Sequence, residues 1–137
     1  MELRQFDKIY HTDHRIVYSC HYHVIFCSKY RRKVLIDAVA VRLKELILSK
    51  QSEYDYIAME MEILPDHVHL LLDVDPRAGI NLVVGKIKGF TSHELREEFP
   101  WLKKRLPTLW TRSKFISTVG AVTVAVVQQY IEQQKGV

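Results

Sequence analysis

The chain has 137 residues, of which 47% are hydrophobic and 26% charged, as is typical of one compact domain. No apolar run approaches the roughly 20 residues that cross a membrane, and the first residues lack the apolar core of a signal peptide. We therefore expect a cytoplasmic protein with no membrane partner. The formal net charge of +4 permits binding to nucleic acid without requiring it.

The hydrophobic pattern predicts the secondary structure, because apolar residues recur every second position in half-buried strands and every three to four positions in helices. The predicted elements, in chain order, are a polar N-terminal arm (1–14), a strand (16–26), a helix (35–48), two strands (56–64 and 67–74) around a Pro65-Asp66 turn, a helix (80–98), a strand (109–118) and a last helix (122–134). No linker or repeat divides residues 1–137, so we expect a single domain.

The order of these elements predicts an α+β fold. Strand, helix, strand, strand, helix and strand follow the ferredoxin-like split βαβ arrangement, an antiparallel sheet with helices on one face. The C-terminal helix, which carries Tyr130, lies outside that unit.

Two histidines, His67 and His69, begin the third predicted strand. Residues i and i+2 of a strand point to the same face, so both imidazoles project together while Val68 packs inward. Two neutral imidazoles side by side make half of a divalent-metal site. Because the pattern is short and His21-Tyr22-His23 repeats it, two unrelated surface histidines remain an alternative. Position 71 is Leu, which excludes the phosphohydrolase pattern of three alternating histidines.

The last predicted helix places Tyr130 and Gln134 four residues apart, one above the other on a single face. A tyrosine on an apolar stripe is commonly a core residue, and that interpretation stays open. Combined with the histidines, Gln134 can supply a further metal ligand through its oxygen, and Tyr130 becomes a candidate nucleophile for phosphate. A phenol, with a pKa of about 10, needs nearby positive charge or a base to lose its proton.

Basic residues gather in two clusters, at 29–33 and at 103–105. The first contains an aromatic residue, and this combination suits phosphate and base together. The residues favoured there for contact with DNA are Lys29, Tyr30, Arg31 and Arg32. The second cluster fits a solvated helix end equally well. Lys86 and Lys88 border the apolar stripe of the second helix and face either DNA phosphates or solvent.

Two segments, PDHVHLLL (65–72) and QQYIEQQ (128–134), resemble the single-tyrosine HUH transposases. These are the TnpA-like enzymes of insertion sequences that move as single-stranded DNA. The resemblance runs from about Tyr22 to Gln134, and its further segments are KYRRKVL (29–35), KGFTSHELREEFP (88–100) and LWTRSKFISTVGAVT (109–123).

The resemblance implies roles for particular residues. His67, His69 and Gln134 would be ligands of Mg²⁺ or Mn²⁺, and Tyr130 would be the nucleophile. The implied substrate is single-stranded DNA with hairpin ends, and attack leaves a 5′-phosphotyrosine and a free 3′-hydroxyl. Members of the family are homodimers in which the tyrosine helix can serve the partner's histidines. Gly120 is the expected hinge, since glycine needs no Cβ clearance.

The sequence thus predicts a metal-dependent transposase that cleaves and rejoins single-stranded DNA. A non-cleaving module of the same fold that binds nucleic-acid hairpins is the alternative. For His21 and His23, contact with DNA or hydrogen bonding is favoured over a second metal. The hairpin, the target sequence and the use of the tyrosine in its own subunit or the partner's stay open.

Overall fold

The computed structural model describes residues 11–13, 16–119 and 124–137. The elements in chain order are β1 (His11–Asp13), β2 (Ile16–Tyr18), β3 (His21–Cys27), the short 3-10 helix η1 (Lys29–Arg31), α2 (Asp37–Ser49), β4 (Tyr56–Leu64), β5 (His67–Val74), α3 (Ile80–Glu98), α4 (Pro100–Arg105), β6 (Phe115–Thr118) and α5 (Val124–Gln133).

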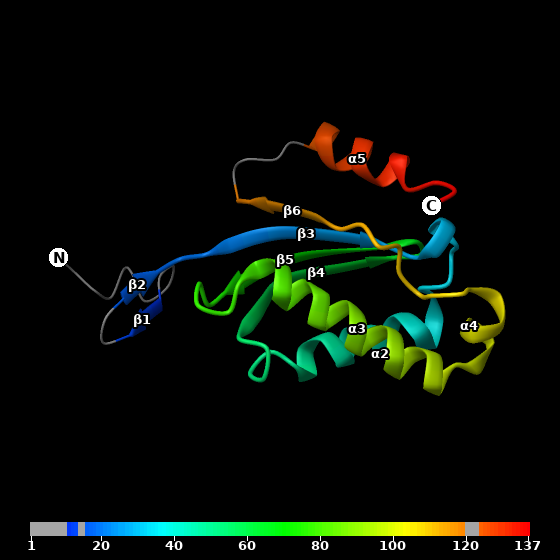
Figure 1. The fold of residues 1–137 in the computed structure, drawn as a ribbon, viewed down its shortest axis with the longest axis horizontal. Helices are drawn as coiled ribbons and strands as arrows, with labels where there is room; N and C mark the ends of the chain where they lie inside the picture. Colours follow the sequence, from blue (N-terminus) through cyan, green and yellow to red (C-terminus); the bar gives the residue numbers. More distant parts are fainter. Residues whose placement is uncertain (1–10, 14–15, 120–123) are drawn as a thin grey trace.

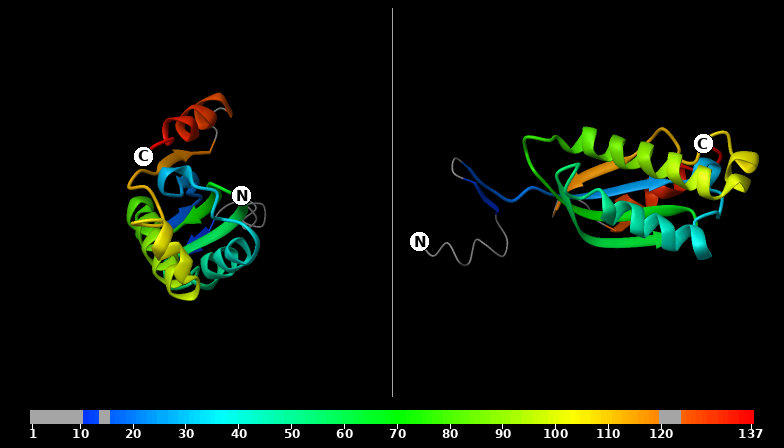
Figure 2. Two further views of the ribbon diagram at one scale, coloured as in Figure 1. Left: turned by 90° about the vertical axis from the view of Figure 1, so that its right-hand side faces the viewer. Right: turned by 90° about the horizontal axis from the view of Figure 1, so that it is seen from below.

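Four of the strands form one antiparallel sheet in the order β4-β5-β3-β6. Helices α2 and α3 cover one face of this sheet, and α5 lies over the other (Figure 1; Figure 2). Before α5 the main sheet and its helices follow strand, helix, strand, strand, helix and strand along the chain. This confirms the predicted α+β fold of split βαβ type.

The hydrophobic core lies between the sheet and the layer of α2 and α3. Val68, Leu70 and Leu72 of β5 are fully buried toward these helices. The helix residues that close the core are Val39, Leu43, Leu46 and Ile47 of α2, and Val83, Val84, Ile87 and Leu95 of α3. Because one face of the sheet supplies the core, side chains on the other face remain available to a site under α5.

The strand predicted over 16–26 is in fact two strands. In the main sheet β3 begins at His21, and β2 pairs instead with β1 as a separate two-stranded sheet. The break occurs because β5 ends at Val74, whose N–H donates to the carbonyl of Cys20, so residues 16–18 have no neighbour in the main sheet. β1 also corrects the predicted irregular arm, of which residues 1–10 and 14 lie outside the described part.

The strand predicted over 109–118 is shorter, because only residues 115–118 form β6. Trp110 turns into the core: its indole N–H donates to Oγ1 of Thr91 at 3.1 Å, and its ring meets Phe26 edge-on with centroids 4.7 Å apart. The backbone around this buried indole therefore leaves the strand ladder, apart from one isolated bridge to Ser28.

The described helices differ from the prediction in where the first one begins and in one additional helix. The first helix begins at Asp37 instead of residue 35, because the N–H of Leu35 donates to the carbonyl of Pro65. Helix α4 was not predicted; it begins at Pro100, whose missing N–H is tolerated in a first helical turn. The last helix is described from residue 124 on, so residues 122 and 123 of its predicted range lie outside the described part. None of the helices described is long and apolar enough to cross a membrane.

Candidate functional site

The histidine strand β5 lies inside the sheet, between β4 and β3. His67 and His69 are half-buried, whereas Val68 between them is fully buried toward the helices. In the strand register His67 is paired with Cys27 and His69 with Ile25, and paired residues on neighbouring strands project to the same face of the sheet. Cys27 and Ile25 are fully buried. The two imidazoles therefore share the sheet face that α5 covers (Figure 1).

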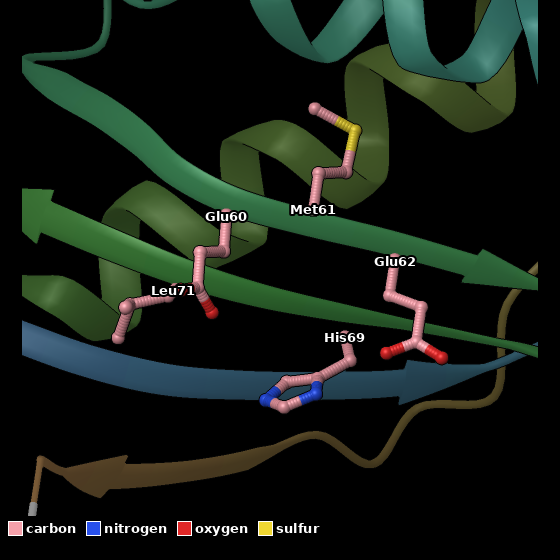
Figure 3. A pocket seen from close by; sticks show the side chains of 5 residues that line it. All are labelled: Glu60, Met61, Glu62, His69 and Leu71. Atoms are coloured by element: carbon pink, nitrogen blue, oxygen red, sulfur yellow. The ribbon is translucent and has the colours of Figure 1, made fainter.

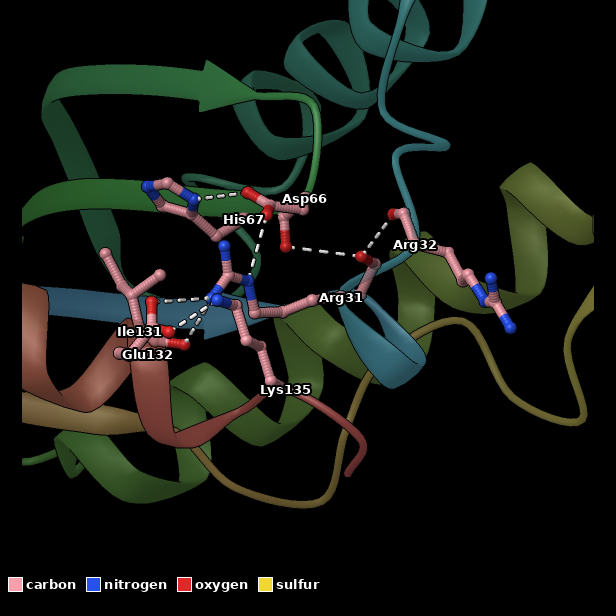
Figure 4. A network of polar contacts seen from close by, with 8 residues as sticks. Arg31, Arg32, Asp66, His67, Ile131, Glu132 and Lys135 are labelled. Carbon is pink, nitrogen blue, oxygen red and sulfur yellow. Dashed lines mark hydrogen bonds and ion pairs between the residues drawn. The ribbon is translucent and has the colours of Figure 1, made fainter.

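Asp66 fixes the orientation of the first histidine. Its Oδ1 lies 2.8 Å from Nδ1 of His67, and its Oδ2 accepts a hydrogen bond from Nε of Arg31 at 3.0 Å (Figure 4). Burial raises the pKa of Asp66, but the hydrogen bonds from His67 and Arg31 lower it more, so the pKa lies below its ordinary value. The ionised carboxylate keeps a proton on Nδ1 of His67 and leaves Nε2 as the free electron-pair donor.

The second histidine contacts another histidine on the neighbouring strand. Nε2 of His69 lies 3.1 Å from Nδ1 of His23. Hydrogen bonding is therefore the role of His23 that the structure contains, among the roles that the sequence left open. Burial lowers the pKa of His69, and His23 lowers it further, against the attraction of Glu62. Glu62 stands opposite on β4 and lines a pocket with His69 (Figure 3). The imidazole of His69 is therefore neutral at pH 7, which is the form that binds metal ions.

Tyr130 lies on the side of α5 that faces the sheet. Its hydroxyl is 2.9 Å from Oγ of Ser113, and its ring packs against Phe115 of β6 with centroids 5.4 Å apart. Burial raises the pKa of Tyr130, and the hydrogen bond with Ser113 only partly opposes that rise. The hydroxyl is therefore protonated at pH 7 and is positioned by the loop that precedes β6.

Gln134 follows α5 directly and is buried, with 6% of its surface exposed. Its Oε1 is buried and has no hydrogen-bond partner among the described residues. The backbone holds it in place, since its N–H donates to the carbonyl of Ile131 and its carbonyl accepts from Val137. An unpaired buried carbonyl oxygen costs about 1–3 kcal/mol, which a bound cation would remove.

Three side chains of the predicted metal site have atoms that could bind a divalent cation. His67 offers Nε2, His69 is neutral, and Gln134 offers a buried oxygen without a protein partner. Within the described ranges no three His, Cys, Asp or Glu side chains form a possible metal site, so a ligand beyond the histidine pair has to be of another type, as the amide of Gln134 is. A carbonyl oxygen with water in the remaining positions suits Mg²⁺ and Mn²⁺, and neutral imidazoles are ligands of the divalent transition metals.

The predicted DNA-contact residues of η1 point in different directions. The side chain of Arg31 is only 19% exposed, and its guanidinium binds protein partners. Tyr30 is 42% exposed, and Nζ of Lys29 lies 5.0 Å above its ring. Lys29 and Tyr30 thus present the cation and aromatic ring predicted for a contact surface, whereas Arg31 holds the protein together.

Arg32 belongs to a basic pocket. It is exposed and lines this pocket together with Lys33, Val34 and Arg105. Arg105 comes from the second basic cluster, at the end of α4, and its guanidinium lies 5.0 Å from the ring of Trp101. The fold therefore joins one residue of the second cluster to the first, which the sequence could not show.

The two lysines of α3 have different surroundings. Lys86 is exposed, and its Nζ lies 5.6 Å from the ring of Tyr54. Lys88 instead donates to the carbonyls of Thr111 at 2.7 Å and Ser113 at 3.0 Å. Lys88 thus anchors the loop that positions Tyr130. Contact of either lysine with DNA stays a prediction, and the predicted hinge at Gly120 lies outside the described residues.

Asp66 and Ser113 are site residues that the sequence reasoning missed. Asp66 was interpreted only as a turn residue, although a carboxylate directly before a candidate metal-binding histidine was a usable signal. Ser113 carried no such signal, because 17 residues separate it from Tyr130 and only the fold brings them together.

Comparisons with known proteins agree with one another. Residues 16–134 match the family model described as "Transposase IS200 like". The ISDra2 transposase TnpA of Deinococcus radiodurans is 39% identical over 120 residues, which are 86% of each chain. The transposase for insertion sequence element IS200 of Salmonella typhimurium is 35% identical over 120 residues, covering 85% of this chain and 78% of that one.

Solved structures show the same similarity. A Deinococcus radiodurans crystal structure assigned as a transposase superposes with a TM-score of 0.85 at 35% identity, covering 93% of this chain and 99% of that one. The structure of a REP-associated tyrosine transposase bound to a REP hairpin matches with a TM-score of 0.57 at 13% identity, covering 89% and 69%. At that identity the second match shows a shared fold.

Proposed function

Because the chain belongs to the IS200-like transposase family, we propose that it cleaves and rejoins single-stranded DNA through a covalent bond to Tyr130. The DNA would come from the ends of an insertion sequence. His67, His69 and Gln134 would hold one Mg²⁺ or Mn²⁺ ion. Such an ion polarises a phosphate and stabilises the charge that develops on it.

One observation carries this proposal: Gln134 and Tyr130 lie at the same end of the helix that covers the histidine face, and Oε1 of Gln134 is buried there without a partner. A protein interior pairs nearly all its buried polar atoms, so an unpaired one suggests a ligand. The identity of the unpaired atom, a hard oxygen donor, fits a hard cation.

The chain's own residues account for the positioning of the nucleophile. Oη of Tyr130 would form a bond to phosphorus while the bond from phosphorus to the 3′-oxygen breaks. Tyr130 gives up its phenolic proton, and the leaving oxygen gains a proton to become a 3′-hydroxyl. Ser113 and Phe115 hold the phenol from two sides before this step. Rejoining is the reverse reaction, and the phosphotyrosine keeps the energy of the broken bond.

The outward-facing basic residues support contact with the DNA backbone. Tyr30 offers an exposed ring for base stacking, and Lys29 places a charge beside it. Arg32, Lys33 and Arg105 bring three cations to one pocket, which suits a phosphate. A hairpin as the substrate is supported by the fold shared with the hairpin-bound REP-associated transposase.

A labelled oligonucleotide from the flanks of the protein's own gene, incubated with Mn²⁺ or Mg²⁺, tests the proposal on a denaturing gel. A label at the 3′ end should enter a protein-sized adduct, because the protein would be joined to the 5′-phosphate of the downstream fragment. A label at the 5′ end should appear on a shortened free strand. Tyr130→Phe and His67→Ala should abolish both products, whereas Tyr54→Phe, on the far helical side, should form them normally.

Two outcomes would overturn the proposal. A native gel shift without any adduct would favour the alternative of a hairpin-binding module that does not cleave. An adduct that persists in Tyr130→Phe would mean that another residue attacks the phosphate.

A homodimer is part of the proposal, and it has its own test. Among the described side chains of α5, the apolar ones are at most half-buried, so this helix is suited to exchange between subunits. Mixing the Tyr130→Phe and His67→Ala proteins should restore the adduct if the tyrosine acts on the partner's histidines. No adduct from the mixture would assign the tyrosine to its own subunit.

A further inference from the structure

Arg31 joins two parts of the site that are far apart in the sequence. Its Nε donates to Oδ2 of Asp66 at 3.0 Å, in the turn before the histidine strand. Its NH1 donates to the carbonyl of Ile131 and to Oε2 of Glu132, both at 3.3 Å, in the last turn of α5 (Figure 4). One guanidinium therefore bridges the tyrosine helix and the turn that holds His67.

The bridge continues to the metal-binding histidine. The other carboxylate oxygen of Asp66 is paired with Nδ1 of His67, so α5, Arg31, Asp66 and His67 form one chain of polar contacts. Arginine suits this place because its rigid planar fork serves two partners in fixed directions. A lysine ammonium would keep the charge without that geometry.

The backbone at Arg31 supports a specific role. Tyr30 and Arg31 have φ angles of 58° and 53°, in the left-handed region that side chains other than glycine rarely adopt. Such residues persist only where their surroundings hold them, and they cluster at functional sites. Here the N–H of Tyr30 donates to the carbonyl of Val137 at 2.8 Å, a second tie between this turn and the chain after α5.

We propose that Arg31 is a positioning residue that couples the docking of α5 to the metal affinity of the histidine site. This rests on the proposed function, in which His67 binds the ion. With α5 docked, Arg31 is held from both sides and keeps Asp66 on His67. With α5 released, Arg31 loses both partners on the helix. Docking of the tyrosine helix and metal binding therefore favour each other, as linkage requires.

A first test changes Arg31 itself and measures Mn²⁺ binding in the absence of DNA by electron paramagnetic resonance. Arg31→Lys should raise the dissociation constant of Mn²⁺ about 10- to 100-fold, the usual range when a residue that orients a metal ligand is lost. Arg42→Lys is the matched control, because Arg42 makes a similar two-point contact with Glu98 in the remote helix layer. It should leave Mn²⁺ affinity unchanged.

A second test of the coupling reverses the charge of Glu132, the residue of α5 that pairs with Arg31. Glu132→Lys should repel Arg31 and weaken Mn²⁺ binding about two- to fivefold, as expected for an exposed ion pair. Glu53→Lys is the control: Glu53 is 61% exposed against 63% for Glu132, and each pairs with a lysine three residues away. Combined with Arg31→Lys, Glu132→Lys should have no further effect.

The outcomes separate this inference from its rivals. Equal Mn²⁺ affinity in Glu132→Lys and Glu53→Lys, with a wild-type protein that binds Mn²⁺ and forms the adduct, would refute the coupling and leave the proposed function intact. A wild-type protein without Mn²⁺ binding would instead refute the proposed metal site. If Arg31→Lys weakens DNA binding in EDTA and leaves Mn²⁺ affinity unchanged, Arg31 is a DNA ligand and the inference is wrong.

Discussion

The half-buried ammonium of Lys88 holds the loop that carries Ser113, and Lys88→Met would remove the charge while keeping an unbranched side chain. Nζ makes two short hydrogen bonds to that loop, to the carbonyls of Thr111 and Ser113. Hydrogen bonds from a charged donor contribute about 1.5–3 kcal/mol each, hence roughly 3–6 kcal/mol for the pair. Burial, with the charge of Lys114, lowers the pKa of Lys88 from 10.5 to about 8, which corresponds to a cost of about 3 kcal/mol. The difference predicts that Lys88→Met lowers the free energy of unfolding at pH 7 by roughly 0–3 kcal/mol.

The same pKa fixes how this difference changes with pH. Between pH 8 and pH 10.5 the unfolded chain keeps the proton of Lys88 while the folded chain has lost it. The unfolded state then binds more protons, so wild-type stability relative to Lys88→Met rises with pH across this window. The slope approaches about 1.4 kcal/mol per pH unit, and the total gain approaches about 3 kcal/mol.

Urea denaturation at pH 7, 8, 9 and 10, followed by tryptophan fluorescence, measures both effects. Trp110 is buried against Phe26 and reports on the core. Lys86→Met is the matched control, because Lys86 is an exposed lysine two residues away on the same helix. It should change stability by little at any pH. Parallel curves for wild type and Lys88→Met from pH 8 to 10 would show that burial does not depress the pKa of Lys88, and the reasoning would fail.

Three further substitutions test single contacts. Ser113→Ala removes the hydrogen bond that lowers the pKa of Tyr130 against burial, so the pH dependence of adduct formation should move to higher pH; an unmoved profile would contradict the contact. Gln134→Leu should raise the free energy of unfolding of the metal-free protein by about 1–3 kcal/mol and weaken Mn²⁺ binding, because it replaces a buried unpaired oxygen. Thr91→Val should lower the free energy of unfolding in urea by about 1–3 kcal/mol, since it leaves the indole N–H of Trp110 buried without an acceptor; a neutral effect would count against that bond.

The fold could be predicted for segments whose hydrophobic periodicity matches the length over which they pair or pack in the structure. The elements at 56–64, 67–74 and 80–98 have the predicted boundaries, although an irregularity between Ala58 and Glu60 leaves Ile57 and Met59 of the first strand exposed. Prediction failed where a distant partner decides the outcome. The strand expected from residue 16 breaks because β5 ends at Val74, and the strand expected from residue 109 is shortened by the burial of Trp110. Neither partner is visible from the local pattern.

The candidate site divides in the same way. The alternation of β5 predicted that His67 and His69 share a face, since strand geometry alone determines it. The roles of Arg31 and Ser113 required contacts across 35 and 17 residues, respectively, that no spacing rule supplies. The shared face of two side chains on one strand was therefore predictable, whereas the contacts from distant residues that orient those side chains were not.

The two faces of the sheet differ in how firmly they hold their helices, and this difference bears on function. Helix α2 buries four apolar side chains against the sheet, whereas the apolar side chains described on α5 are at most half-buried. Much of what joins α5 to the sheet face is polar, through Arg31, Ser113 and the histidine turn. Polar contacts re-form readily in a second place, whereas a buried apolar stripe must first be exposed to water. Under the proposed function, a fold that keeps its core on one face of the sheet and Tyr130 on the other would allow Tyr130 to move without unfolding the core.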